Sequence, residues 1–186
     1  MATRTLTKLE ADASAATAVP IAALAGGTPT TPVILALDLG HCTGWALRSA
    51  CGVIASGVAE FPPDRWQGGG MKFLRFRRWL TELKIAAGGL DAMFYEQVRN
   101  HAGVDASHAY GGWLAMLTAW CEHHGIAYEG IPVGTIKRHI AGKGNADKAA
   151  VIAAVRLLGF QPADENEADA LALLNWATAN GVGVVR

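Results

Sequence analysis

The chain has 186 residues, of which 51% are hydrophobic and 17% charged, a composition typical of one globular domain with a substantial core. Sixteen basic residues balance sixteen acidic ones, so the overall charge gives no sign of nucleic-acid binding and only a local cluster can. No apolar run approaches the ~18 residues of a membrane span. The three cysteines favour reduced thiols in a cytosolic compartment over a disulfide framework.

The first 31 residues are rich in Ala and Thr. We expect them to form a flexible tail, or one loosely formed helix, ahead of a folded domain at residues 32–186. A secretory signal would place its basic residues directly before an apolar core, but Glu10 and Asp12 intervene here. We therefore favour a tail over a signal peptide.

A continuous apolar run, Val33–Leu37, lies between Pro32 and the sequence Asp38-Leu39-Gly40. Such a run predicts a strand that is buried on both faces and ends at Asp38. A single Asp after a strand is most often a turn former or a cap. Its role here therefore depends on partners from the rest of the chain.

Two further strands are predicted at residues 44–49 and 52–59, joined by a tight turn, because apolar residues partly alternate there. The Pro- and Gly-rich segment 61–70 predicts a loop. Residues 71–87 have apolar side chains at helical spacing with basic residues between them. We favour a solvated face for these basic residues over a phosphate-binding surface.

A second buried strand is predicted at residues 90–96, and it also ends in a carboxylate, Glu96. We expect Asp105 to cap a long helix that runs to Glu122 and stops at Gly125. A short strand follows at residues 126–131.

The segment 135–148 has a lopsided charge, with four basic residues against one acidic residue. It is either an ordinary basic surface loop or a surface that approaches a phosphate backbone. Gly142–Gly144 could present backbone N–H groups to a phosphate.

Asp147 is expected to cap a helix that runs to Leu158 and ends at Gly159, and a final helix is predicted at 166–179. Three strands, a helix, a strand, a helix, a strand and then helices predict an α/β domain. Its central sheet is expected to be mixed and five-stranded, with helices on its faces.

Three acidic residues stand out from this arrangement: Asp38 and Glu96 at strand ends, and Asp169 before an apolar run in the last helix. Adjacent strands lie about 5 Å apart, so carboxylates at matching strand ends can share a divalent cation with a third from a helix. Such a cluster is electrostatically costly unless a metal occupies it. Two hard cations can promote phosphodiester cleavage.

The other acidic residues near Asp169 have a simpler explanation. Asp164, Glu165 and Glu167 are expected in the first turn of the final helix, where they complement the helix dipole.

At this point four motifs resemble the RuvC-type Holliday junction resolvases of the ribonuclease H-like superfamily, particularly the phage and prophage branch. They occur in the family's order and span residues 33–178. The motifs are Leu37–Gly40 with Thr43–Ala46, Tyr95–Val98, Ile136–Lys137 with Gly142–Lys148, and Glu167–Ala172.

The resemblance implies a ribonuclease H-like fold and a homodimeric endonuclease that nicks two strands symmetrically at a four-way junction. It implies two Mg²⁺ ions per active site, for which Mn²⁺ can substitute. Branched DNA is the implied partner, and the cytoplasm of a bacterium or a phage-infected cell is the implied location.

Carried over by position, Asp38, Glu96 and Asp169 would be catalytic metal ligands. The family usually has an acid or a His three residues before the last Asp, and Asn166 stands there in this chain. An Asn offers a carbonyl oxygen but no charge. Either Glu165 or Glu167 could therefore take the place of the fourth ligand.

The resemblance also assigns basic residues to the DNA. Lys137 and Lys148 match positions that contact the junction backbone and the scissile phosphate, which makes Lys148 a candidate catalytic residue. Arg138 and Lys143 lie in the same basic segment. Arg99 stands where well-studied members have an aromatic wedge, so wedging must come from elsewhere or be absent, and strict sequence selectivity is not expected.

Two other functions are left open by the sequence. A non-catalytic branched-DNA-binding protein could retain this fold, and Asn166 favours that hypothesis. An actin-like ATPase or sugar kinase is suggested by Asp38–Gly40 with Thr43–Gly44. Those enzymes duplicate the domain and need far more chain than this one has.

Overall fold

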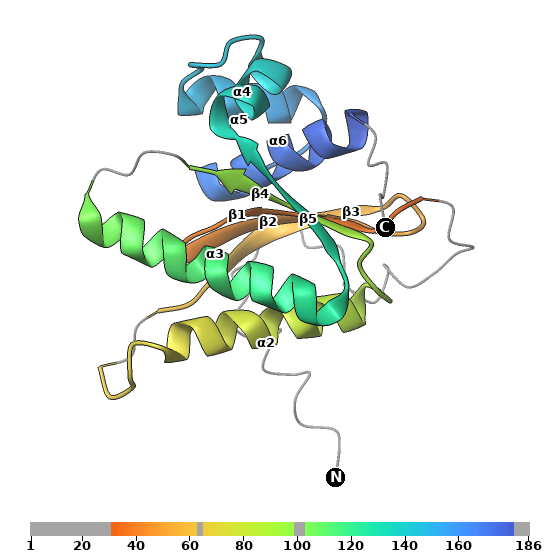
Figure 1. Ribbon diagram of the computed structural model, residues 1–186. Coiled ribbons are helices and arrows are strands. Elements are labelled where there is room, and N and C mark those ends of the chain that lie inside the picture. Colours follow the sequence, from red (N-terminus) through yellow and green to blue (C-terminus); the bar gives the residue numbers. More distant parts are fainter. Residues whose placement is uncertain (1–30, 63–64, 99–102, 181–186) are drawn as a thin grey trace.

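The computed structural model describes residues 31–62, 65–98 and 103–180. These residues form a five-stranded mixed sheet in the order β3-β2-β1-β4-β5 (Figure 1). β1 pairs in parallel with β4, and β4 with β5, whereas β2 is antiparallel to both β1 and β3. The strands are β1 (Ile34–Asp38), β2 (Cys42–Arg48), β3 (Ile54–Glu60), β4 (Ala92–Gln97) and β5 (Ala127–Pro132). The sheet predicted from the sequence is confirmed.

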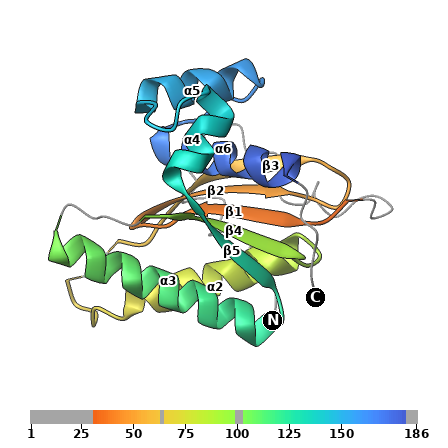
Figure 2. The same cartoon turned by 45° about the horizontal axis from the view of Figure 1, so that its top comes forward.

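Helices cover both faces of this sheet in three layers (Figure 2). α2 and α3 lie on one face, and α4, α5 and α6 lie on the other. The helices are α2 (Met71–Ala86), α3 (Val104–His124), α4 (Val133–Ala141), α5 (Lys148–Leu157) and α6 (Glu165–Ala179). In the part of the chain described, no helix combines the length and the apolar character that crossing a membrane requires.

The apolar run in β1 serves both layers because side chains alternate across a strand. Leu35 and Leu37 belong to the core against α2 and α3, whereas Ile34 and Ala36 belong to the core against α6. All four side chains are fully buried. The absence of alternation in this run therefore reflects a strand with helices on both faces.

The predicted tail lies almost entirely outside the described residues, which begin at Thr31. Thr31 itself is attached to the domain, since its backbone N–H and its hydroxyl both donate hydrogen bonds to the carbonyl oxygen of Ala50, at 3.3 and 3.1 Å. The described domain thus includes one residue that the sequence assigned to the tail.

Of the two predicted N-caps, one is confirmed and one is wrong. The Asp147 carboxylate accepts a hydrogen bond from the Ala150 backbone N–H at 2.8 Å and caps α5 as expected. By contrast, α3 begins after Gly103, and Asp105 lies within its first turn without capping it. At the other end of α3, Gly125 adopts the left-handed conformation (φ 64°) that terminates a helix.

No helix was predicted in the first half of the basic segment 135–148, but the structure has α4 there. The helix begins directly after β5, and Ile136 packs into the core against α6. Val133, Ile136 and Ile140 have the spacing of an amphipathic helix. That spacing is the signal that would have predicted it.

Candidate active site

Asp38 and Glu96 lie side by side at the carboxyl ends of two parallel strands. The register pairs Leu37 of β1 with Tyr95 of β4, so Asp38 and Glu96 occupy the next position along each strand. Even-numbered side chains of both strands, such as Ala36 and Phe94, face the α6 layer. Both carboxylates continue that face, because side chains alternate along a strand.

Asp169 reaches the same region from α6, which packs across β1 and β2. It is half-buried in the first half of the helix. Its charge acts on both Asp38 and Glu96, raising the pKa of each. The structure therefore places the three carboxylates that the sequence singled out within electrostatic range of one another.

Burial is the main cause of unusual pKa values at this cluster. Burial, together with the charges of Asp169, Asp164 and Glu165, raises the pKa of Asp38 from 3.8 to about 7. Burial, together with the charges of Asp38 and Asp169, raises the pKa of Glu96 from 4.5 to about 8. The pKa of Asp169 is raised by burial as well. Perturbed carboxyl groups at strand ends are typical of functional sites.

The cluster has the donor chemistry that a hard divalent cation prefers, since every donor is a carboxylate oxygen. Within residues 31–62, 65–98 and 103–180, no hydrogen bond or ion pair satisfies the side chains of Asp38, Glu96 or Asp169. In the same ranges, no three acidic, His or Cys side chains converge on a single point as a finished metal site does. In donor type and in the absence of hydrogen-bond or ion-pair partners, these carboxylates fit a hard divalent cation.

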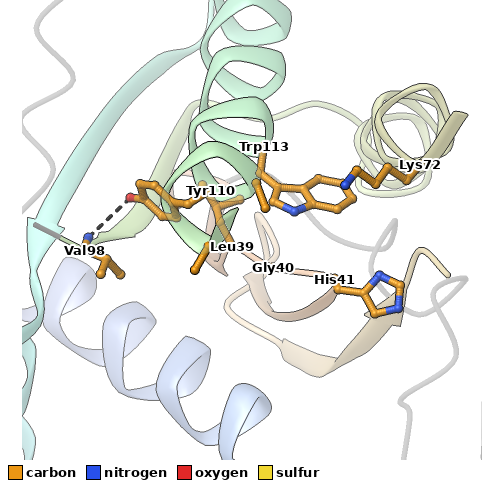
Figure 3. Close-up of a pocket in the computed structure, with 9 residues that line it drawn as sticks. Leu39, Gly40, His41, Lys72, Val98, Tyr110 and Trp113 are labelled. Atoms are coloured by element: carbon orange, nitrogen blue, oxygen red, sulfur yellow. Dashed lines mark hydrogen bonds between the residues drawn. The ribbon is translucent and has the colours of Figure 1, made fainter. Parts of the chain in front are cut away.

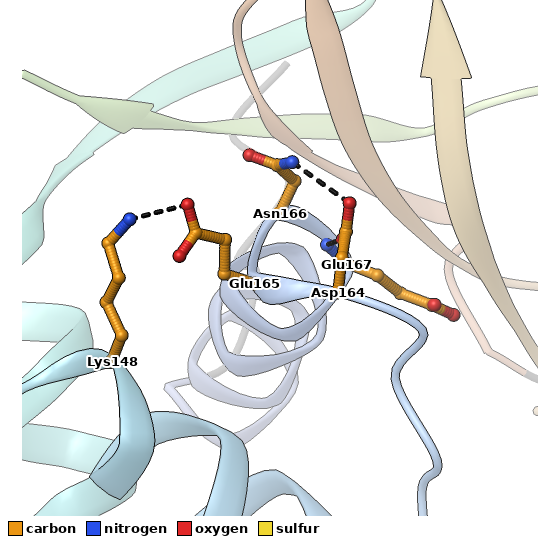
Figure 4. Close-up of polar contacts among 5 residues, drawn as sticks. All are labelled: Lys148, Asp164, Glu165, Asn166 and Glu167. Carbon is orange, nitrogen blue, oxygen red and sulfur yellow. Dashed lines mark hydrogen bonds and ion pairs between the residues drawn. The ribbon is translucent and has the colours of Figure 1, made fainter.

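Two lysines face the cluster from α4 and α5. The Lys137 charge lowers the pKa of Glu96, and the Lys148 charge lowers that of Asp38. Lys137 Nζ donates a hydrogen bond to the Ala146 carbonyl oxygen at 2.8 Å, which ties α4 to the loop before α5. Lys148 Nζ forms an ion pair with Glu165 at 2.5 Å (Figure 4).

The side chains around Asn166 point in different directions: Glu165 extends toward Lys148, and Glu167 extends away from it (Figure 4). Asn166 Nδ2 donates to Asp164 Oδ2 at 3.1 Å, and Asp164 Oδ1 also accepts the Glu167 N–H as the cap of α6. The charges of Asp164 and Glu165 both raise the pKa of Asp38, so both carboxylates lie within electrostatic range of the cluster.

Glu167 has a different environment from its neighbours. Its side chain is buried, and it accepts hydrogen bonds from the Ser56 hydroxyl at 2.6 Å and the Ala163 backbone N–H at 2.7 Å. The first hydrogen bond fastens the start of α6 to β3, and the second holds the chain just before α6. This geometry favours a structural role for Glu167, so Asn166 and Glu165 are the better candidates for the fourth ligand.

The turn after Asp38 is held by contacts of Gly40, Thr43 and Gly44, which belong to the first sequence motif. The buried Thr43 hydroxyl donates to the Gly40 carbonyl oxygen at 2.8 Å. The adjacent Gly44 lies directly against the backbone of Asn166, where a side chain would not fit. These contacts hold the end of β1 and the start of α6 in a fixed relationship.

The remaining sequence candidates lie farther from the carboxylates or outside the described residues. Arg138 and Lys143 are exposed, on α4 and in the loop after it. The Arg138 guanidinium lies near Gly144, where an added Cβ would be 3.2 Å from its Nη2. Arg99 falls outside the described residues.

One residue of this site was not found from the sequence. The Tyr110 hydroxyl on α3 donates to the Glu96 carbonyl oxygen at 2.9 Å and accepts from the Val98 N–H at 3.4 Å. It therefore braces the end of the strand that carries Glu96. No local pattern marks it, because Tyr110 is also an ordinary member of the apolar face of α3.

No protein-family model matches the sequence, and no curated protein sequence matches it. Solved structures do resemble it. Thermus thermophilus RuvC in complex with a Holliday junction substrate has a TM-score of 0.63 and 18% identity, over 77% of this chain and 90% of that chain. Another T. thermophilus RuvC structure has a TM-score of 0.58 and 19% identity, over 76% and 90% of the two chains.

A third structure, the yeast mitochondrial Holliday junction resolvase Ydc2, has a TM-score of 0.53 and 10% identity, over 81% of this chain and 79% of that chain. At these identities the likeness concerns the fold. The chain has the α/β fold of the RuvC-type resolvases, as the motifs in the sequence predicted.

Proposed function

We propose that this protein is a structure-selective DNA endonuclease that cuts four-way (Holliday) junctions or other branched DNA by metal-dependent phosphodiester hydrolysis. The observation that carries the proposal is the cluster of Asp38, Glu96 and Asp169, with raised pKa values and two lysines facing it. The fold adds support, since the structures it resembles are a RuvC bound to a Holliday junction substrate and a Holliday junction resolvase.

The carboxylates of Asp38, Glu96 and Asp169 would hold Mg²⁺, or Mn²⁺ in its place, and two ions per site is the arrangement we favour. Bound there, the metal activates a water and stabilises the leaving oxygen of the phosphodiester. The Asn166 amide or the Glu165 carboxylate would complete the ligand set. In this proposal Glu165 contributes the charge that Asn166 lacks.

The basic residues would bring the DNA backbone to the carboxylates. Lys148 would contact the scissile phosphate, exchanging its ion pair with Glu165 for one with the phosphate. Lys137 would hold the adjoining backbone, and Arg138, Lys143 and Arg99 would extend that contact. Because the chain is neutral overall, this local concentration of positive charge would orient DNA on one side of the molecule.

Symmetric cutting of a four-way junction needs two active sites, so we propose a homodimer as the active form. The free thiols of Cys42, Cys51 and Cys121 fit a reducing cytoplasm, in a bacterium or a phage-infected cell. The phage branch of the resolvases is the branch whose motifs the sequence resembles.

The second candidate is a branched-DNA-binding protein without catalysis, favoured by Asn166 at the position of the fourth ligand. Cleavage of a panel of branched DNAs with Mg²⁺, with linear duplex as the control, separates the two. Nicking of four-way junctions that stops with EDTA supports the nuclease. Tight junction binding without nicking in Mg²⁺ or Mn²⁺ supports the non-catalytic protein and overturns the nuclease.

A further inference from the structure

An open hollow of about 270 Å³ lies at the carboxyl edge of the sheet, on the α2 and α3 side (Figure 3). Its lining comes from three places. Leu39, Gly40 and His41 follow β1, Val98 follows β4, and α2 and α3 supply Lys72 and a row of small and aromatic side chains. The volume is slightly below the roughly 300 Å³ at which pockets for drug-sized ligands begin, so it suits a single ring system.

The walls of the hollow are held in place before any ligand arrives. The hydroxyl of Tyr110 is hydrogen-bonded to the backbone of Glu96 and Val98, and these hydrogen bonds fix the ring. Trp113 packs edge-on against Phe73 with ring centroids 4.8 Å apart. The Phe61 N–H donates to the His41 carbonyl oxygen at 3.0 Å and fixes the loop after β1. A rigid aromatic wall lowers the entropy cost of binding a flat ligand.

The hollow adjoins the proposed active site around the ends of β1 and β4. Leu39 is the residue after Asp38, and Val98 is two residues after Glu96. Two residues of extended chain span about 7 Å. The charges of Glu96 and Asp38 also reach Tyr110, where they add to the effect of burial in raising the pKa of the phenol. A strand whose phosphate lies at the carboxylates therefore passes beside the hollow.

The chemistry of the lining favours a nucleobase. Tyr110 provides the aromatic surface, with the buried Trp113 ring behind it, and Ala106 and Ala109 are small enough to leave the space beside it open. Lys72 Nζ lies 4.8 Å from the Phe73 ring centroid and 5.9 Å from that of Trp113, so its charge is directed along the rim. Aromatic surface with a neighbouring cation is the usual means of holding an unpaired base in a nucleic-acid strand.

We propose that this hollow receives one unpaired base of the branched DNA, taken out of the stack next to the phosphate held at the carboxylates, and that the base packs on Tyr110. The inference rests on the proposed function. At a branch point, taking a base out of the stack costs less free energy, because nucleotides there have already lost part of their stacking and pairing. The hollow would thereby restrict which phosphate is presented for cleavage.

The test fills the hollow without touching the carboxylates. Ala106 and Ala115 are both exposed residues of α3, but only Ala106 lines the hollow. Ala106→Leu therefore removes space from the hollow, and Ala115→Leu is the matched control. Binding to four-way junctions is measured in EDTA, with an abasic site placed singly at each nucleotide next to the branch point.

For the unmodified protein, we expect one abasic position to weaken junction binding about tenfold, at the lower end of the effect of losing a stacked base. Ala106→Leu should bind the intact junction about as weakly and should no longer distinguish it from the abasic one, whereas Ala115→Leu behaves like the parent. A 2-aminopurine base at that position should lose fluorescence on binding the parent and keep it on binding Ala106→Leu.

Two results overturn the inference, and they differ in what they leave standing. If the parent binds junctions selectively but abasic sites affect it and Ala106→Leu equally, the base-binding inference alone fails. If the parent prefers no branched DNA over linear duplex, the proposed function fails and takes this inference with it.

Discussion

Gly44 and Asn166 touch through their backbones: a Cβ on Gly44 would lie 1.9 Å from the carbonyl oxygen of Asn166. Because β2 is paired with β1, this contact sets how closely α6 approaches the end of the strand that carries Asp38. Glycine is therefore required at position 44 by packing rather than by backbone conformation.

Replacing Gly44 by Ala should force α6 away from β2 and lower the free energy of unfolding by about 1–3 kcal/mol, the usual cost of overpacking. Urea denaturation measures it. Gly111→Ala is the control, because nothing lies within 4 Å of a Cβ there and alanine is the better helix former. Equal stability of the two variants would show that α6 can shift without cost.

Asp38→Asn should reduce junction cleavage by more than about 100-fold, the upper end of the effect of altering a residue that only supports a metal ligand. Binding to the junction should be kept or tightened, because a negative charge next to the phosphate is removed. Asp105→Asn, an exposed exchange of the same kind on α3, is the control. A parallel loss of binding and cleavage would indicate a folding defect instead.

The stability of the metal-free protein should fall as the pH rises from about 4 to about 8. Burial and neighbouring carboxylates raise the pKa of Asp38 to about 7 and of Glu96 to about 8. Over that window the folded state binds more protons than the unfolded chain, so raising the pH favours unfolding. Thermal unfolding in EDTA at pH 5 and pH 8 measures the difference.

Two controls follow from the same linkage. Asp38→Asn should lose less stability between pH 5 and pH 8 than the parent, and Mg²⁺ should raise the unfolding temperature of the parent at pH 8 by binding the folded state. Stability that rises with pH in EDTA would contradict the burial of these carboxylates.

Glu165→Gln and Glu167→Gln should have opposite consequences, although the residues lie two positions apart. Glu167→Gln should cost about 1–3 kcal/mol of unfolding free energy, because the amide cannot accept from both Ser56 and Ala163. Glu165→Gln should leave stability nearly unchanged, since its pair with Lys148 is exposed, but should weaken Mn²⁺ binding measured by calorimetry. The reverse pattern would exclude Glu165 as the fourth ligand.

Lys143→Ala and Lys137→Ala should each lower the slope of log binding constant against log salt by about 1, as expected for loss of one phosphate contact. Only Lys137→Ala should also lower the unfolding temperature, because Lys137 holds the Ala146 carbonyl. An unchanged salt dependence in both variants would place the DNA elsewhere on the surface.

The strands and the three carboxylates were predictable because their signals are local. β1 is a continuous apolar run, and Asp38 and Glu96 each follow such a run directly. Helix caps such as Asp147 are local too, and the rule failed at Asp105, where Gly103 precedes the first turn instead.

Contacts between distant segments could not be predicted in the same way. Ser56 and Glu167 are 111 positions apart, so nothing in either neighbourhood indicates that Glu167 is buried rather than exposed in a helix's first turn. Gly44 also carries no sign of the Asn166 backbone that it accommodates. For α4 the signal was present in the spacing of its apolar residues, but the concentration of charge in that segment concealed it.

The face of the sheet to which Asp38 points depends on whether it stands at an even or an odd position along β1. Even-numbered side chains of this strand face α6 and odd-numbered ones face α2 and α3, so inserting one residue before Asp38 would exchange the two sets. The Asp38 carboxylate would then face the aromatic side chains of α2 and α3, and a leucine would face Lys137 and Lys148. Loops such as residues 65–70 can change length during evolution, but β1 can vary only by substitution.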